Sequence, residues 1–420
     1  MRSIRSLLCC WLASWLSLGA AARVAETRAV PAVHVRDGLP HVAAAARERG
    51  ELRVAYLGGS ITAADGWRPL TTARLRELFP NVRVIEIDAG LPGTGSDLGA
   101  CRVGRDMLRL RPDVVLVEFA VNDAATPPEQ VERTMEGIVR QVKRANPLTD
   151  ICFVYTVSTP GLADLQAGLF PAAAAAMETV AEHYGVPSLH WGVEVARQIA
   201  AGQLAFKGGA DDAARVFSLD GVHPTAVGHR LYFAELDRAL PELLRKKAPA
   251  TSLPPPLRRD NWERATLREL DASVLRGAWS PVSATDENLR GISKALLSPT
   301  WRAAEPGAAV EIEFTGTRFG LLGIAAPDSG EFVVTLDECA PVRGTFFDAY
   351  ASPTFCREQQ WFFPDALGAG QHRARIELSA AAVDKAAIKA RAGKTLDDPA
   401  RYAPQRLTLC GVLVVDTARP

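Results

Sequence analysis

The chain has 420 residues, of which 48% are hydrophobic and 23% charged, and its 48 Lys and Arg residues balance its 48 Asp and Glu residues. This length exceeds that of one ordinary domain, so we expect two folded domains, each with a hydrophobic core. A net charge of zero excludes the strong basic field that attracts nucleic acids or anionic membranes. We therefore expect neither partner, and a neutral or small substrate.

The N-terminus has the pattern of a secretory signal peptide over residues 1–22. Arg2 and Arg5 precede an apolar run at 7–18, and small residues at 19–22 offer a cleavage site. The run is shorter than the roughly 20 apolar residues that span a bilayer, which favours cleavage over a membrane anchor. We expect a secreted or periplasmic protein without a membrane span in its mature form.

Residues 30–245 are predicted to form an α/β domain, because short β-rich segments alternate with longer helical ones. The expected strands span residues 53–57, 82–87, 114–119, 151–156 and 186–189. The expected helices span residues 67–79, 98–110, 129–145, 172–184 and 225–240. Thr126 and Glu129 have the spacing of a capping box before the third helix. This alternation predicts a parallel sheet covered by helices on both faces.

A proline-rich linker is predicted over residues 246–258, because consecutive prolines block both helix and sheet. In the remaining segment, 259–420, apolar residues alternate at period two or form short runs between turn residues. These runs span residues 310–314, 319–324, 331–336, 372–378 and 407–415. The pattern predicts an accessory domain that is an antiparallel β-sandwich, jelly-roll-like in type.

Five cysteines lie outside the predicted signal, and this odd number leaves at least one thiol free. In an oxidising compartment Cys339 and Cys356 could pair, whereas the role of a small buried hydrophobic residue fits each cysteine at least as well. The sequence has no Cys-x-x-Cys motif and no cluster of Cys and His that would indicate a metal site. We expect no metal and no cofactor.

A serine follows the first predicted strand in the segment Gly58-Gly59-Ser60. The glycines allow a sharp turn that exposes the hydroxyl, at the sheet edge where α/β proteins place their active sites. On its own this pattern fits an ordinary turn with a serine helix cap better than an active site. Further segments at the same edge of the sheet favour the active site instead.

Three of these segments carry polar groups suited to acyl transfer. Gly93 follows the second predicted strand, Asn122 follows the third, and Asp220 and His223 lie one turn apart before the last helix. An imidazole, with a pKa of about 6.5, can take the proton of a serine hydroxyl near neutral pH. A neighbouring aspartate fixes its tautomer, and amide groups can stabilise the oxyanion.

We therefore interpret Ser60 as nucleophile, His223 as base and Asp220 as the orienting acid. The candidate oxyanion donors are the amides of Ser60 and Gly93 and the side-chain amide of Asn122.

In order and spacing these blocks resemble the SGNH (GDSL-like) hydrolase superfamily, and within it a Gly-Gly-Ser-Ile-Thr subgroup, over residues 51–244. The resemblance implies a flavodoxin-like, three-layer α/β fold and the residue roles just given. Three positions depart from the family pattern. Gly59 stands where many members have aspartate, Asp88 where asparagine usually opens the second block, and Ala120 where glycine usually opens the third. None of them removes a catalytic group.

Other polar residues near these blocks have structural or peripheral interpretations. Glu118 ends an apolar strand, where a buried charge must be paired, so we expect an ion pair with Arg102 or Arg105. Trp67 and Arg68 follow the nucleophile closely and are candidates for lining the mouth of the site, although helix packing explains Trp67 about as well. Asp123 is expected to anchor its loop through backbone hydrogen bonds.

The leading interpretation is a secreted serine esterase that removes short acyl groups, such as acetate, from a carbohydrate or polysaccharide ester. Acyl transfer, or cleavage of lipids or thioesters, uses the same residues and stays open. A third alternative is a carbohydrate-binding or cell-surface protein on a disabled hydrolase scaffold, against which the intact catalytic set argues. Because every catalytic part precedes residue 244, we expect the second domain to position substrate without supplying a catalytic group.

Overall fold

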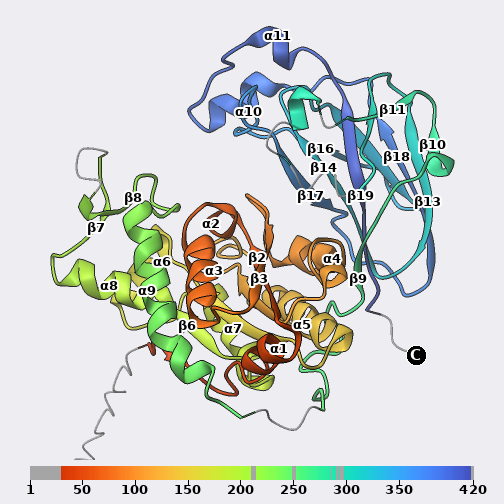
Figure 1. Ribbon diagram of the computed structural model, residues 1–420. Coiled ribbons are helices and arrows are strands. Elements are labelled where there is room, and N and C mark those ends of the chain that lie inside the picture. Colours follow the sequence, from red (N-terminus) through yellow and green to blue (C-terminus); the bar gives the residue numbers. More distant parts are fainter. Residues whose placement is uncertain are drawn as a thin grey trace, which may run out of the picture.

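The computed structural model describes residues 30–209, 214–247, 252–283, 285–289, 292 and 298–417. The predicted signal peptide, residues 1–22, lies outside the described residues. The chain forms an N-terminal α/β domain and a C-terminal domain of antiparallel sheets, which lie against each other (Figure 1). Within the described ranges, no helix is long and apolar enough to cross a membrane.

The α/β domain is built on a six-stranded sheet with the order β1-β6-β5-β4-β2-β3, in which β1 is antiparallel and its five companions are parallel. The strands are β1 (Val33–His34), β2 (Glu51–Gly58), β3 (Arg83–Gly90), β4 (Val114–Glu118), β5 (Asp150–Tyr155) and β6 (Ser188–His190). The five predicted strands are β2 to β6. Their spatial order, 2-1-3-4-5 in chain order, is the flavodoxin-like order that the resemblance implied.

Helices cover both faces of this sheet and bury its apolar residues in two clusters. One face packs against α4 (Ser96–Asp106), α5 (Pro128–Ala145) and α7 (Ala172–His183). The other packs against α1 (Val42–Arg49), α3 (Trp67–Leu78), α8 (Trp191–Ala200) and α9 (Ala226–Leu243). The shorter elements are α2 (Ser60–Ala63), α6 (Thr159–Gln166), β7 (Ala205–Lys207) and β8 (Val216–Ser218).

The predicted capping box before α5 is not formed. The helix starts at Pro128, and its N-cap residue is Pro127 rather than Thr126, with no side-chain cap. A proline in the first turn has no N–H to be capped and its backbone angle already suits a helix, which explains the start at this position.

The C-terminal domain contains two antiparallel sheets around a shared apolar core. One sheet has the order β10 (Leu275–Arg276), β13 (Ala309–Thr315), β18 (Gln371–Leu378), β15 (Glu331–Leu336) and β16 (Val342–Thr345). The second has the order β11 (Trp279–Pro281), β12 (Trp301–Ala303), β19 (Leu407–Val415), β14 (Arg318–Ala325) and β17 (Arg357–Phe362), with β9 (Ala265–Arg268) also paired to β19. Helices α10 (Lys385–Arg391) and α11 (Pro399–Tyr402) follow β18. The five predicted strands are all present.

The two domains share one hydrophobic cluster, which explains why they lie in contact. Trp262, just past the predicted linker, packs in the same cluster as Met135 of α5 and Leu413 of β19. Within the linker, the backbone amide of Leu257 donates a 2.6 Å hydrogen bond to Glu136 of α5. The described end of the linker is therefore attached to the α/β domain.

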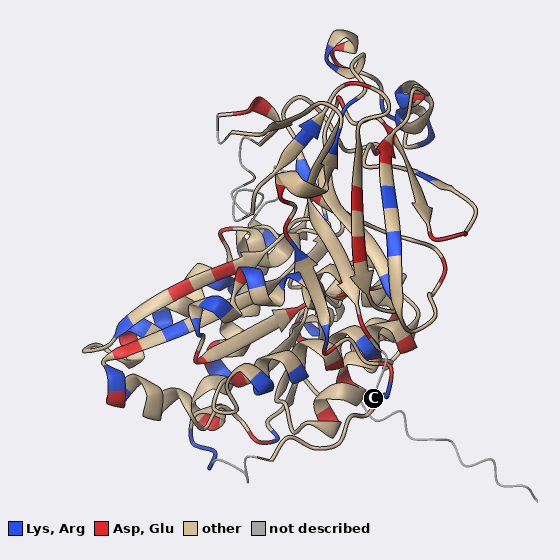
Figure 2. Ribbon diagram, turned by 90° about the vertical axis from the view of Figure 1, so that its right-hand side faces the viewer, with Lys and Arg blue, Asp and Glu red and all other residues tan. Residues whose placement is uncertain are grey.

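The cysteines within the described residues are free thiols. Cys339 is exposed and Cys356 is half-buried, and the disulfide considered from the sequence is not formed between them. Burial raises the pKa of Cys356 to about 12, so its thiol stays protonated. Basic and acidic residues are mixed along the ribbons of both domains, in keeping with the balanced composition (Figure 2).

Candidate active site

The predicted nucleophile, Ser60, lies at the turn where β2 ends and α2 begins. A side chain at either glycine before it would collide with its surroundings. A Cβ atom at Gly58 would lie 2.2 Å from Oγ1 of Thr62, and one at Gly59 would lie 2.0 Å from Oδ1 of Asn122. The two glycines are thus needed for close packing, and this packing brings the Asn122 carboxamide against the serine turn.

Three of the predicted site residues form a line of hydrogen bonds. Oγ of Ser60 is 2.8 Å from Nε2 of His223, and Nδ1 of the same ring is 2.6 Å from Oδ2 of Asp220. The other carboxylate oxygen of Asp220 accepts the backbone amides of Val222 and His223, each at 2.8 Å, and the Ser218 hydroxyl at 3.0 Å. The carboxylate therefore holds both the imidazole and its own loop.

These contacts determine that Asp220 is ionised and which ring nitrogen of His223 carries the proton. Partial burial raises the pKa of Asp220, but the hydrogen bonds from His223 and Val222 outweigh it and hold the pKa far below its usual range. A carboxylate that stays ionised keeps the proton on Nδ1, so that the lone pair of Nε2 faces Ser60. The side chains of His223 and Asp220 are 52% and 55% exposed, so water can reach the imidazole.

Three N–H groups are predicted as donors to an oxyanion: the amides of Ser60 and Gly93 and the side-chain amide of Asn122. Gly93 adopts a left-handed backbone with φ of 74° in the turn after β3. Within the described residues, no hydrogen bond is made by the amides of Gly93 and Ser60 or by the side-chain amide of Asn122. Donors without an internal acceptor can bind the charge that develops on an ester carbonyl oxygen.

Glu118 does not form the expected ion pair with Arg102 or Arg105. Arg102 binds Asp106 on its own helix at 2.7 Å and also donates to the carbonyl oxygens of Gly58 and Ala89.

Glu118 is fully buried and accepts hydrogen bonds from Thr62 at 3.0 Å and Thr156 at 2.6 Å. Burial raises its pKa, against the effect of these hydroxyls and of the Gly59 amide. Its role is to hold the turn that carries Ser60. The two threonines could not be selected from the sequence, because only the fold brings them to the carboxylate.

Asp123 anchors its loop through a backbone amide, as expected. Its carboxylate accepts the amide of Ser96 at 3.0 Å, and a Cβ at Gly95 would lie 2.3 Å from its Oδ1. Burial raises the pKa of Asp123 to about 7. This contact ties the loop bearing Asn122 to the start of α4, three residues after Gly93.

The two candidate residues for the mouth of the site are buried instead. Trp67 has no exposed surface, and its ring packs against Tyr56 and Trp191 with centroid distances of 5.4 and 4.9 Å. Arg68 donates to the carbonyl oxygen of Thr62 at 3.0 Å and is 6% exposed. Trp67 is therefore a packing residue, and Arg68 supports the segment that follows Ser60.

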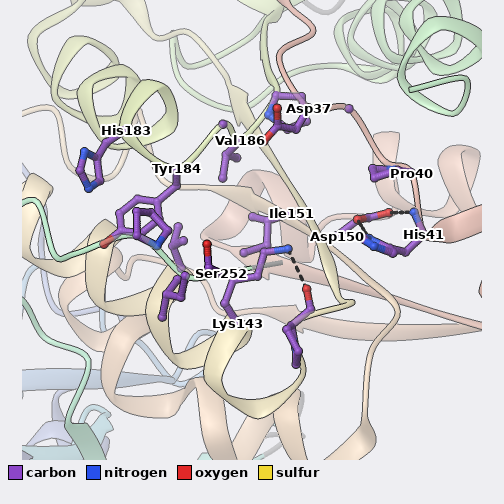
Figure 3. A pocket seen from close by; sticks show the side chains of 17 residues that line it. Asp37, Pro40, His41, Lys143, Asp150, Ile151, His183, Tyr184, Val186 and Ser252 are labelled. Carbon is purple, nitrogen blue, oxygen red and sulfur yellow. Dashed lines mark hydrogen bonds and ion pairs between the residues drawn. The ribbon is translucent and has the colours of Figure 1, made fainter. Parts of the chain in front are cut away.

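A separate cavity of about 290 Å³ lies at the opposite edge of the sheet, where strands begin (Figure 3). Several of its polar side chains are already engaged. Asp150 binds His41 at 2.7 Å, and the Lys143 ammonium donates to the carbonyl oxygen of Thr149 at 2.8 Å. Ser60 does not line this cavity. In the part of the chain that is described, no group of three or more His, Cys, Asp or Glu could hold a metal ion.

Comparison with known proteins connects this geometry to a family. The model of the GDSL-like lipase/acylhydrolase family matches residues 56–231. No curated protein matches the chain in sequence. Two solved structures are similar over both domains: a two-domain esterase active on acetylated mannans, co-crystallized with mannopentaose, and a second structure of such an esterase. Each is 19% identical and covers 92% of this chain and 98% of its own, with TM-scores of 0.71 and 0.70. The two-domain fold is therefore shared.

Proposed function

We propose that this chain removes acetyl groups from a polysaccharide. The premise is that its α/β domain belongs to the GDSL-like lipase/acylhydrolase family, whose members hydrolyse ester bonds. The observation that carries the proposal is the pair of hydrogen bonds, 2.8 and 2.6 Å long, that connects Ser60 through His223 to Asp220. This arrangement gives a serine hydroxyl both a base and a fixed direction.

In the first half of the proposed reaction, Oγ of Ser60 attacks the ester carbonyl carbon while its proton passes to Nε2 of His223. The carbonyl π electrons become a negative charge on oxygen, which binds the free N–H groups of Ser60, Gly93 and Asn122. Asp220 stabilises the imidazolium. When the tetrahedral intermediate collapses, the carbon–oxygen bond to the sugar breaks, and the sugar oxygen takes the proton from His223. An acetyl-serine remains.

In the second half, water replaces the alcohol. It loses a proton to Nε2 of His223 and adds to the acetyl carbon, and the collapse of the second intermediate returns the proton to Oγ of Ser60 and releases acetic acid. The base is about half exposed, which gives water direct access to the acyl-enzyme. This access supports hydrolysis over transfer to a second alcohol, because transfer requires water to be excluded.

The proposed substrate class follows from the fold that is shared over both domains. The two similar esterases act on acetylated mannans, so acetylated mannan is the first polysaccharide to test. A polymer of this kind is met outside the cytoplasm, in agreement with the predicted signal at residues 1–22. Sequencing the N-terminus of protein isolated from its host tests whether this signal is cleaved, and an uncleaved N-terminus would contradict the cleavage.

The proposal is tested by release of acetate from acetylated mannan, acetylated xylan and aryl esters of graded chain length. We expect turnover of acetyl esters to exceed that of longer acyl chains, with acetate appearing in solution. Ser60→Ala should abolish both turnover and covalent labelling by a fluorophosphonate. Failure of the wild-type protein to label would support the disabled-scaffold alternative. Acetyl transfer to an added sugar in preference to water would identify a transferase.

A further inference from the structure

The C-terminal domain reaches the loop that carries the oxyanion glycine. Arg357 is the first residue of β17, and its side chain occupies the space beside Gly93. A Cβ atom added to Gly93 would be 3.2 Å from Nε and 3.6 Å from Cδ of Arg357. The side of Gly93 where a Cβ would stand thus faces a residue of the other domain.

The side chain of Arg357 is itself held on several sides. Its guanidinium forms an ion pair with Asp348 through both terminal nitrogens and lies 5.7 Å from the ring centroid of Phe355. A further contact of 3.4 Å joins it to Gln359. The side chain is 11% exposed. A long cationic side chain fixed in this way presents a rigid surface.

Asp348 is also fixed, because it accepts the backbone amides of Tyr350 at 2.8 Å and Ala351 at 3.0 Å. Burial raises the pKa of Asp348, but the Arg357 guanidinium and these amides have the larger, opposite effect. The pKa therefore lies below its usual value, and the carboxylate is ionised. The ion pair has no net charge. Arg357 therefore acts on Gly93 by position and not through an unbalanced positive charge.

Strand β17 then continues along helix α4, which begins three residues after Gly93. Gln360 donates to Asp97 in the first turn at 3.2 Å, and buried Glu358 lies 3.5 Å from Arg105 in the last turn. Both ends of the helix are thereby attached to the same strand. Rotation of the domains against each other would break both of these contacts.

We propose that Arg357 is a positioning residue of the active site, which fixes the oxyanion loop at Gly93 from the C-terminal domain. This inference depends on the proposed function, because it assumes that the Gly93 amide binds the oxyanion. It gives the C-terminal domain a part in the reaction of every ester, including esters too small to contact that domain. The expectation that this domain positions substrate without supplying a catalytic group is extended accordingly.

The test measures 4-nitrophenyl acetate hydrolysis by the full chain and by Arg357→Ala, with Arg343→Ala as the matched control. Arg343 pairs with Glu331 on an exposed part of the same domain, so its removal deletes an ion pair without touching Gly93. We expect Arg357→Ala to lower kcat by roughly tenfold to a hundredfold with KM within about threefold, because a misplaced oxyanion donor weakens transition-state binding. Arg343→Ala should match the wild type.

A second readout separates positioning from general stability. Methylboronic acid adds to a catalytic serine and mimics the tetrahedral intermediate, so its inhibition constant should rise in Arg357→Ala by about the same factor as kcat/KM falls. If Arg357→Ala does not fold, Asp348→Asn decides, since it keeps Arg357 but weakens the ion pair that holds it. We expect kcat to fall at least threefold in Asp348→Asn.

The outcomes distinguish this inference from the proposed function. Wild-type protein that hydrolyses no acetyl ester and does not label with a fluorophosphonate contradicts the proposed function. An active wild type whose kcat is unchanged by folded Arg357→Ala, or by Asp348→Asn where Arg357→Ala is unfolded, overturns the role of Arg357 alone. A fall in kcat with an unchanged boronate inhibition constant also overturns it, because the oxyanion loop would then be intact.

Discussion

Replacement of Gly59 by alanine tests the architecture of the serine turn most directly. The added Cβ would lie 2.0 Å from Oδ1 of Asn122, whereas ordinary contacts begin at 3.4 Å, so the carboxamide or the turn must move by about 1.4 Å. Misplacement of a catalytic group by about 1 Å can lower the rate on the order of a hundredfold. Loss of one oxyanion donor costs on the order of 10²- to 10³-fold in kcat. We expect Gly59→Ala to fall in this range.

The assay is steady-state hydrolysis of an aryl acetate, together with a thermal unfolding curve that shows the variant is folded. Gly104→Ala is the matched control, because a Cβ at that position of α4 meets no atom within 4 Å. A double-mutant cycle identifies the target of the clash. If Gly59→Ala acts by displacing Asn122, the variants Asn122→Ala and Gly59→Ala/Asn122→Ala should have similar kcat. Full additivity, or wild-type kcat in Gly59→Ala, would refute the reasoning.

Four further predictions concern neighbouring residues. Ser60→Ala should lower kcat at least about 10⁴-fold with an unchanged melting temperature, and residual turnover above that level would place the nucleophile elsewhere. Asp220→Asn should lower kcat by on the order of 10³- to 10⁴-fold, because no carboxylate then keeps the proton on Nδ1 of His223. Fluorophosphonate labelling should become slower but persist. Glu118→Ala should lower the free energy of unfolding, measured in urea, by at least about 2 kcal/mol, since two buried hydroxyls lose their acceptor; an unchanged urea midpoint would contradict this role. Asp123 has a folded pKa of about 7, above its unfolded value of about 3.9, so its contribution to stability falls as pH rises from about 4 to about 7. The melting temperature of Asp123→Asn relative to wild type should therefore be higher at pH 8 than at pH 4.5, and an equal difference at both would exclude this titration.

The sequence predicted the α/β fold well because its signals are local. Each parallel strand is a short apolar run, and the polar groups follow the strand ends, where the sheet topology necessarily collects them. The same reasoning brought Asn122 and His223 to Ser60. Sequence reasoning was weaker for Glu118, because a buried carboxylate must have polar partners but the sequence does not identify which residues these are. A local signal was available there: Arg102 and Asp106 are spaced i, i+4 on one helix, which favours their pairing over a contact with Glu118.

Arg357 illustrates what a sequence pattern cannot supply. Its contact with Gly93 depends on how two domains dock, and docking is decided by a shared apolar cluster and by pairs such as Arg105 with Glu358, none of which has a fixed spacing.

The turn with His223 and Asp220 and the loop at Gly93 therefore differ in which domain holds them in place. The proposed base, His223, and Asp220 lie on one short turn of the α/β domain and hold each other through hydrogen bonds of 2.6 and 2.8 Å. The loop proposed to bind the oxyanion is instead tied at Ser96 to Asp123 of its own domain, and at Gly93 it faces Arg357 of the other. A change at the domain interface should therefore lower kcat while leaving the pH dependence of the base unaltered, because nothing that binds His223 or Asp220 belongs to that interface.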